Sequence, residues 1–260
     1  VIYKTTNYGK RWSKVANGIA DGAFVRVVRE DTERKDMLYA GTETGLYISY
    51  NGGKDWEEFQ LNLPVVPITD IKVHGNDLVL STQGRAFWVL EDLSALRGLT
   101  DDVMSADAHL FAPIPAFDFI TNRQSDPGQA GNPQDGAHIH YSLKDEPGDD
   151  VDVSIEILDV DKVLRTFDGD DVSTDAGMNT HHWDMSVEPI KGIPGVFTVL
   201  GAPGSEIDGY SVAPGAYTVR LNVGDASYEQ PLNVTLDPRS DVPAAAYQAS
   251  VSTTETLYAM

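Results

Sequence analysis

One eight-residue motif occurs twice in this chain, with the two copies 44 residues apart. Residues 5–12 read Thr-Thr-Asn-Tyr-Gly-Lys-Arg-Trp and residues 49–56 read Ser-Tyr-Asn-Gly-Gly-Lys-Asp-Trp, so both fit Ser/Thr-x-Asn-x-Gly-x-x-Trp. A fixed period of this size predicts a repeat architecture. The first copy stands close to Val1, so we expect the chain to start inside a repeat and to be the tail of a larger protein.

Short apolar runs bounded by turn residues surround the motif. They are predicted strands at residues 24–28, 37–42, 45–49, 68–73, 77–82 and 86–90. Four short strands per cycle of about 44 residues is the size of a propeller blade. Because blades bury their faces against neighbours, the remainder of the ring is expected to come from another segment of the parent chain. Glu91-Asp92-Leu93 stands where a third motif is due, which predicts that the repeat ends there.

The residue types of the motif predict a structural turn between the third and fourth strands. Asn closes such a turn through its side-chain oxygen, Gly permits positive φ, the hydroxyl accepts a further bond and the Trp packs beneath. The predicted structural site residues are Thr5, Asn7, Gly9, Trp12, Ser49, Asn51, Gly53 and Trp56. Trp side chains also serve as sugar platforms, but their place in the repeat favours a packing role.

Residues 137–237 predict a second all-β domain after the 1–102 repeat segment. Its alternating strands fall at residues 138–143, 151–158, 163–167, 179–184, 215–223 and 228–236. About seven short strands over such a length suggest an immunoglobulin-like or fibronectin-III-like β-sandwich. Residues 103–136 are predicted to be a linker with a long loop, and residues 238–260 a partly helical tail.

The charge is distributed unevenly. Residues 1–102 hold 12 Lys/Arg and 15 Asp/Glu, whereas residues 103–260 hold 7 and 25. Such an acidic surface repels phosphate backbones, so we expect no nucleic-acid partner. This excess of acidic residues is typical either of a protein adapted to salty water or simply of an acidic domain. There is no Cys, which excludes disulfides and thiolate chemistry, and no apolar run long enough for a transmembrane helix.

The sequence contains residue types that occur in three kinds of chemical site. His138, His140, His181 and His182 could ligate zinc or copper, but no third ligand is marked by spacing, which favours ordinary strand positions. The acidic runs at 149–152, 159–161 and 168–171 could hold calcium, but none has the spacing of a calcium loop, which favours solvated loops. The arginines of residues 1–102 show no pattern typical of a sialidase. We therefore expect no cofactor, with calcium as the remaining alternative.

The motif resembles the Asp-box of the BNR and sortilin-like propellers, with Asn in place of Asp in both copies. The strand pair at 38–47 and the runs at 62–67, 82–88, 213–219 and 236–239 resemble the closing part of large secreted bacterial proteins labelled glycosyl hydrolase, BNR repeat. The resemblance implies terminal propeller blades followed by a sandwich domain, and an extracytoplasmic location, periplasmic or secreted. The Asp-box itself says almost nothing of function.

These observations predict a non-catalytic scaffold that binds a protein or glycan, within a larger assembly that supplies the remainder of the propeller. Two alternatives stay open. One is part of a glycoside hydrolase, a sialidase-like propeller whose catalytic residues lie in missing sequence. The other is an accessory extrinsic subunit of a membrane protein complex.

Overall fold

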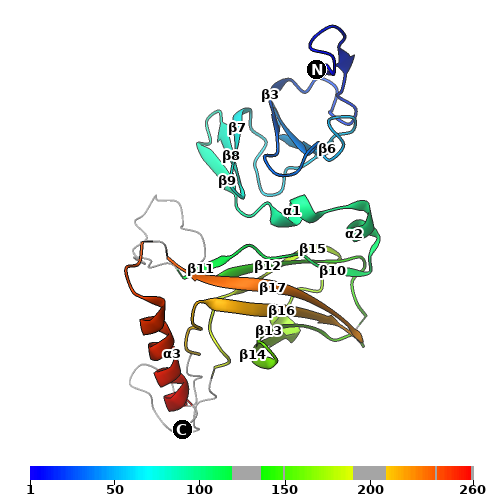
Figure 1. Cartoon of the computed structure of the whole chain (residues 1–260). Helices are drawn as coiled ribbons and strands as arrows, with labels where there is room; N and C mark the ends of the chain where they lie inside the picture. Colours follow the sequence, from blue (N-terminus) through cyan, green and yellow to red (C-terminus); the bar gives the residue numbers. More distant parts are fainter. Residues whose placement is uncertain (119–135, 149, 190–208, 238, 259–260) are drawn as a thin grey trace. The chain divides into compact units, whose positions relative to one another are not determined.

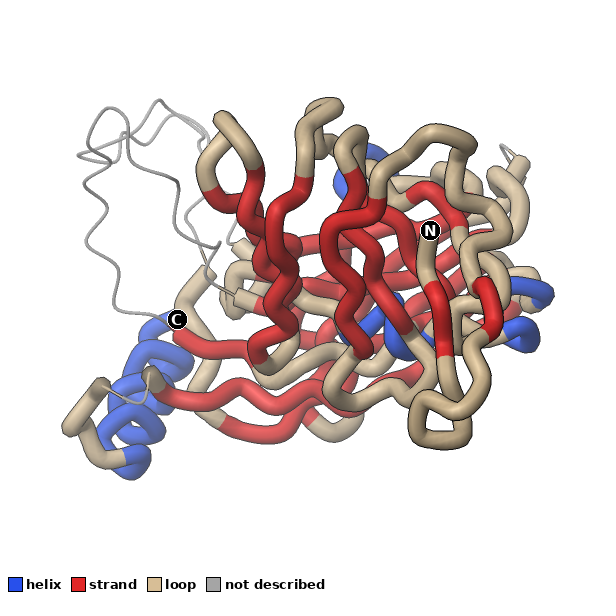
Figure 2. The backbone as a smooth tube through the Cα atoms, turned by 90° about the horizontal axis from the view of Figure 1, so that it is seen from above, coloured by secondary structure: helices blue, strands red, loops and turns tan. Residues whose placement is uncertain are grey.

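The structure is a computed structural model that describes residues 1–118, 136–148, 150–189, 209–237 and 239–258. The chain divides into two compact units, Val1–Arg97 and Gly98–Met260. Strands dominate both units (Figures 1 and 2), so the chain belongs to the all-β class. No helix of the described residues combines the length and the apolar character that a membrane crossing requires.

The first unit contains a two-stranded hairpin and two larger antiparallel sheets, the first sheet and the second sheet. A hairpin pairs β1 (Tyr3–Lys4) with β2 (Ser13–Lys14). The first sheet is a meander of β3 (Val25–Glu30), β4 (Leu38–Thr42), β5 (Leu46–Ser49) and β6 (Glu57–Glu58). The second sheet holds β7 (Ile68–His74), β8 (Asp77–Thr82) and β9 (Phe87–Leu90), and α1 (Ser94–Gly98) follows.

The first and second sheets are built alike in detail. Both have a register shift at the start of the first strand pair, between Val25 and Val27 and between Ile68 and Asp70. In both, a threonine hydroxyl at the end of the second strand donates to a turn carbonyl: Thr42 to Gly45 at 2.9 Å and Thr82 to Ala86 at 2.7 Å. The repeat predicted from the motif therefore extends through the strand registers.

A single apolar cluster fills the space between the first and second sheets. Fully buried members come from both, including Tyr39 and Ile48 of the first sheet and Ile71 and Leu78 of the second. Alternating apolar residues in strands place one face of each sheet against this cluster. The two sheets thus form one layered body, which agrees with short strands that cannot bury their faces alone.

The second unit is built from two sheets around one core. The three-stranded sheet has the order β10 (Ala108–Leu110), β12 (Ala137–Leu143), β15 (Gly177–Trp183). The five-stranded sheet has the order β11 (Ala116–Asp118), β17 (Ala226–Leu236), β16 (Gly215–Val223), β13 (Val153–Asp159), β14 (Lys162–Asp168). The remaining elements are α2 (Asp101–Ser105), a 3-10 turn (Gly169–Asp171) and α3 (Ala244–Tyr258).

The core of the second unit draws on both sheets. Ile139, Tyr141 and Trp183 come from the three-stranded sheet, and Ile155 and Val219 are among those from the five-stranded sheet. The ring of Trp183 meets the ring of Tyr217 edge-on, with centroids 6.0 Å apart. The Tyr217 hydroxyl donates to the carbonyl of Ala213 at 2.6 Å, which closes the chain at the entrance of β16.

The segment predicted as a linker, residues 103–136, differs from that expectation. It contains β10 and β11, which pair with β12 and β17 and so belong to the sandwich. The two strands have three residues each, too few to show a period, and Pro113 and Pro115 between them favour an extended linker in any local analysis. Residues 119–135, which hold most of the predicted long loop, lie outside the described residues.

Candidate functional site

The second copy of the motif forms the turn between β5 and β6. The Ser49 hydroxyl accepts a hydrogen bond from the Gly53 amide at 3.0 Å, and the side-chain oxygen of Asn51 accepts one from the Asp55 amide at 2.9 Å. Gly53 has φ +85°, a backbone conformation that suits glycine. Trp56 is only 3% exposed. The four predicted residues of this copy therefore lie together in one turn.

The first copy forms the same turn between β1 and β2. The Thr5 hydroxyl accepts from the Gly9 amide at 2.9 Å, and the side-chain oxygen of Asn7 accepts from the Arg11 amide at 2.8 Å. The two turns differ in their tryptophans, because Trp12 is 58% exposed. The hydrogen bonds of the turn therefore do not depend on burial of its tryptophan.

The chain segment that follows the first copy covers Trp56. The indole N–H of Trp56 donates to the carbonyl of Val15 at 3.1 Å, and its backbone amide donates to the carbonyl of Asn17 at 2.8 Å. A Cβ on Gly18 would come within 1.9 Å of the Trp56 carbonyl oxygen, so only glycine fits there. The turn of the second copy is thus completed by the segment that follows the first copy.

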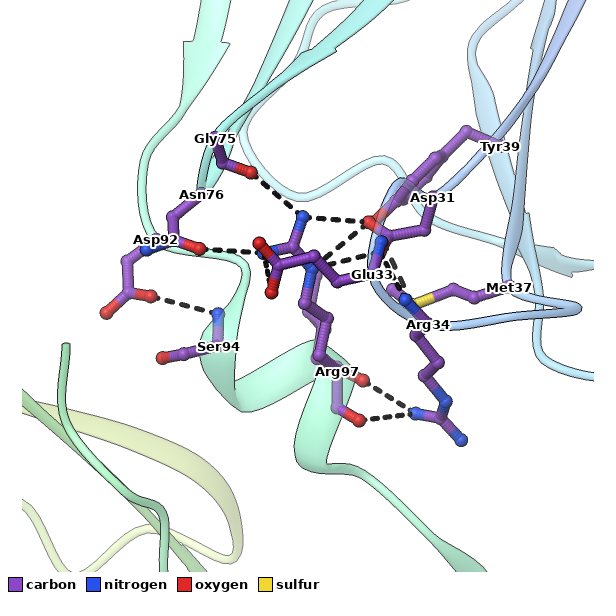
Figure 3. Close-up of polar contacts among 11 residues, drawn as sticks. Asp31, Glu33, Arg34, Met37, Tyr39, Gly75, Asn76, Asp92, Ser94 and Arg97 are labelled. Atoms are coloured by element: carbon purple, nitrogen blue, oxygen red, sulfur yellow. Dashed lines mark hydrogen bonds and ion pairs between the residues drawn. The ribbon is translucent and has the colours of Figure 1, made fainter.

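A buried charge network joins the first sheet, the second sheet and α1 (Figure 3). Arg97 is 9% exposed at its side chain, and its guanidinium donates to both carboxylate oxygens of Asp31, whose side chain is fully buried. The same guanidinium donates to Asn76 Oδ1 at 2.7 Å and to the Gly75 carbonyl at 2.9 Å. Glu33 lies 3.3 Å from it.

The electrostatics of Asp31 reflect two opposed effects. Burial alone would raise the pKa of Asp31, but the Arg34 amide, the Arg97 guanidinium and the Glu33 amide together hold that pKa below its usual value of 3.8. Burial, followed by the Asp31 carboxylate, raises the pKa of Tyr39. The site therefore keeps a fixed carboxylate–guanidinium pair.

Three further arginines of the first unit, Arg26, Arg29 and Arg34, each contact other groups of the protein. Arg26 pairs with Glu43 at 2.7 Å and Arg29 with Asp70 at 2.6 Å. Arg34 lies over the Tyr50 ring, with its guanidinium carbon 4.6 Å from the ring centroid, and donates to the carbonyls of Leu96 and Arg97. These guanidinium groups are engaged by the protein itself, so they do not form a receptor for a substrate carboxylate.

The histidines of the second unit lie on both faces of the three-stranded sheet. His138 stands opposite His182 in the strand register, with ring centroids 5.5 Å apart, and His140 bonds Thr180 at 2.8 Å. His181 lies on the core face against Phe167, and burial lowers its pKa. The described residues contain no group of three or more His, Cys, Asp or Glu that could hold a metal ion. Asp149 of the predicted calcium candidates lies outside those residues.

An apolar groove lies between the first and second sheets, beside β9. Its space of about 370 Å³ includes open solvent at the mouth. Its walls are Phe59–Leu63 after β6, Leu46 of β5, Leu78 and Leu80 of β8, and Trp88–Leu90 of β9. Sequence reasoning missed this groove, although the missing third motif after Leu90 is a signal that β9 has no strand following it.

Comparisons with known proteins identify no family for this chain. No protein-family model matches the sequence, and no curated protein matches it. Two solved structures of the extracellular domain of BT4673 from B. thetaiotaomicron are similar at 9% sequence identity, with TM-scores of 0.25 and 0.26. They cover 87% and 88% of this chain, which spans only 27% and 28% of theirs.

Proposed function

We propose that this chain is a non-catalytic scaffold and binding segment of an extracytoplasmic protein. In this proposal residues 1–97 are blades of a β-propeller with Asp-box turns, and the second unit is an immunoglobulin-like sandwich. The observation that carries the proposal is repetition: the first and second sheets share a register shift and a threonine hydroxyl bond to the following turn, and the β1–β2 and β5–β6 connections share the motif turn. Repeats of this kind need neighbours to cover their outer faces.

Two features support the sandwich half of the proposal. The sheets β10-β12-β15 and β11-β17-β16-β13-β14 follow the strand order of immunoglobulin-like domains, in which the first strand is shared between both sheets. The bond from the Tyr217 hydroxyl to the Ala213 carbonyl, at the start of the penultimate strand, has the geometry of the tyrosine corner of that fold.

The character of the surfaces supports binding over catalysis. Asp31 and Arg97, the buried ion pair of the first unit, are occupied with each other and with backbone groups. The groove beside β9 is apolar and holds no charged side chain among its lining residues. Such a site suits an apolar side chain of a partner better than the charge that develops in hydrolysis.

Separate expression of residues 1–102 and 103–260 tests the proposal. We expect residues 103–260 to unfold cooperatively as a monomer, and residues 1–102 to lack a cooperative transition because their outer sheet faces need neighbouring blades. A monomeric, cooperatively folded 1–102 fragment would contradict a partial propeller. Turnover of chromogenic aryl glycosides by the intact chain would contradict the non-catalytic assignment.

A further inference from the structure

The second sheet lacks the outer strand that the first sheet has. In the first sheet β6 pairs with β5, and Leu46 and Ile48 of β5 are each 3% exposed because they pack in the apolar cluster between the first and second sheets. In the second sheet the matching residues of β9 are Phe87 and Val89, which are 75% and 52% exposed. Among the described strands, β9 pairs with β8 alone. The second sheet therefore has an open strand edge at β9, and two large apolar side chains of that strand lie exposed on a face of the sheet.

The backbone of β9 presents hydrogen-bonding groups at the same edge. The Thr82 amide donates to the Ala86 carbonyl, and the register pairs Leu80 with Trp88 and Leu78 with Leu90. Antiparallel pairs alternate between bonded and non-bonded, so Trp88 and Leu90 bond β8. The amides and carbonyls of Phe87 and Val89 consequently point away from β8, as those of Leu46 and Ile48 point toward β6.

The groove beside β9 is the counterpart of the place that Trp56 fills in the first sheet. Trp56 packs with Ala40 and Tyr47 and is covered by the segment 15–18. By the 44-residue offset of the motif, residues 59–62 correspond to residues 15–18. By the strand registers, Leu80 corresponds to Ala40 and Trp88 corresponds to Tyr47. These counterparts line the groove. Its space of about 370 Å³ includes solvent at the mouth, so the groove is an open apolar hollow that a side chain can enter from outside.

We propose that the edge of β9 and this groove bind an extended strand from outside these 260 residues, which inserts a tryptophan or another large aromatic side chain into the groove. The strand pairs with Phe87 and Val89 as β6 pairs with β5. Its recognition pattern is that of Trp56–Phe59: an aromatic residue, two polar residues, then an apolar one. The inference rests on the same repeat as the proposed function and names the partner of that binding segment.

A second copy of this chain is poorly suited to supply the strand that binds β9 and the groove. Its one exposed tryptophan is Trp12, followed by β2. However, β2 already uses the required edge to pair with β1, because the Val15 amide donates to the Ile2 carbonyl at 2.9 Å. That bond matches the 2.9 Å bond from Phe59 to Leu46 in the first sheet. The hairpin would have to open before it could occupy β9.

Binding of a synthetic peptide to the intact chain tests the proposal. The probe is a fluorescein-labelled peptide of residues 49–60, which carries one Lys and three Asp/Glu, so the acidic protein does not attract it non-specifically. Fluorescence anisotropy should show saturable binding, at least tenfold weaker for the peptide with Trp56→Ala. Equal binding of the two peptides, or no binding at millimolar concentration, would overturn the proposal.

Two protein variants locate the site. Leu61 and Val65 are both exposed apolar residues after β6, at 65% and 80%, but only Leu61 lines the groove. Leu61 has φ 45°, which Asp tolerates better than Leu, so Leu61→Asp should not harm the fold. We expect L61D to weaken peptide binding at least tenfold and V65D to change it less than twofold. Equal effects of the two variants would contradict the assignment.

Amide hydrogen exchange in the intact chain tests the strand pairing. Saturating peptide should slow exchange at Phe87 and Val89 at least tenfold and leave Trp88 and Leu90, which bond β8, nearly unchanged. Protection from exchange at another strand edge would overturn the proposal. A dimer of the chain in analytical sedimentation, abolished both by Leu61→Asp and by Trp12→Ala, would also overturn it, because a second copy would then occupy the groove. If the peptide fails while residues 1–102 still lack a cooperative transition, only this inference fails and the proposed function stands.

Discussion

Arg97 donates to both carboxylate oxygens of Asp31, although the two residues lie 66 positions apart in the chain. Asp31 follows β3 of the first sheet, and Arg97 lies in α1 after the second sheet. The pair therefore links the end of β3 to the helix that follows the second sheet. Around it, Asn76 and Gly75 hold the guanidinium to the β7–β8 turn, so three elements depend on one cation.

We expect Asp31→Asn to destabilise the first unit by roughly 3–5 kcal/mol, because it removes the buried counter-ion of Arg97 and leaves only the exposed Glu33 carboxylate beside that charge. Urea unfolding followed by tryptophan fluorescence measures the loss. Arg26→Gln is the matched control: it breaks the more exposed pair with Glu43 and should cost less than about 1 kcal/mol. Similar losses in the two variants would show that the buried pair contributes no more than a surface one.

The same pair predicts a dependence of stability on acid. The pKa of Asp31 is lower in the folded chain than its usual 3.8, so its contribution is fully present above that value. It is lost as pH falls from 3.8 through the lower folded value. The difference in unfolding free energy between the wild-type chain and Asp31→Asn should thus be constant above about pH 5 and shrink below it. A difference that grows toward acid would contradict the assignment.

The two motif tryptophans make a matched pair. Trp56→Ala should destabilise the first unit by roughly 3–5 kcal/mol, because the side chain is buried and its indole N–H is bonded to Val15. Trp12→Ala should cost about 0.5 kcal/mol or less in this chain, since that side chain is mostly exposed. Thermal unfolding of both variants tests this, and a loss under about 1 kcal/mol for Trp56 would assign it to a ligand surface instead.

Alanine substitutions at two glycines distinguish the cost of backbone strain from the cost of a steric clash. Gly18 and Gly22 have φ of +91° and +85°, so alanine is strained at both, at about 1 kcal/mol. Only at Gly18 would the added carbon also meet the backbone of Trp56, whereas nothing lies within 4 Å at Gly22. We expect Gly18→Ala to lower the unfolding free energy by a further 1–3 kcal/mol or so. Equal losses would show that the segment moves freely over the motif turn.

Tyr217→Phe removes the bond that closes the entrance of β16. The carbonyl of Ala213 loses its partner, so the second unit should lose about 0.5–1.5 kcal/mol at neutral pH. Burial raises the pKa of Tyr217 from 10.0 to about 12. The neutral hydroxyl therefore contributes fully below pH 10 and progressively less toward pH 12. The wild-type advantage over Y217F should fade across that interval, and an advantage that persists above it would contradict this account.

Local signals in the sequence account for most strands. The predicted strands at 77–82 and 215–223 have the observed bounds, and the strand predicted at 68–73 ends one residue later in the structure. Strong alternation or β-branched runs decide these segments without help from the rest of the chain. The motif turn was also predicted in place, between the third and fourth strands, because the Ser/Asn/Gly chemistry of turns is local.

What the sequence does not show depends on contacts between distant segments. β10 and β11 are strands only because β12 and β17 lie beside them, and nothing near Asp31 indicates Arg97 as its partner. The unequal burial of Trp12 and Trp56 is likewise invisible in two nearly identical motifs, since the difference lies in the covering segment. The groove beside β9 arises from the absence of a strand, which no residue pattern within the groove records.

The parallel pairing of β11 with β17 has a consequence for the order of events during synthesis. Ala116 accepts a hydrogen bond from the Thr235 hydroxyl at 3.1 Å, across 119 residues. A ribosome makes β11 long before β17, so the first strand of this sheet lacks its neighbouring strand while most of the domain emerges. The sheet order can be completed only when the last strand leaves the exit tunnel. Proteolysis that removes β17 therefore deprives β11 of its sheet, although the two strands stand at opposite ends of the domain's sequence.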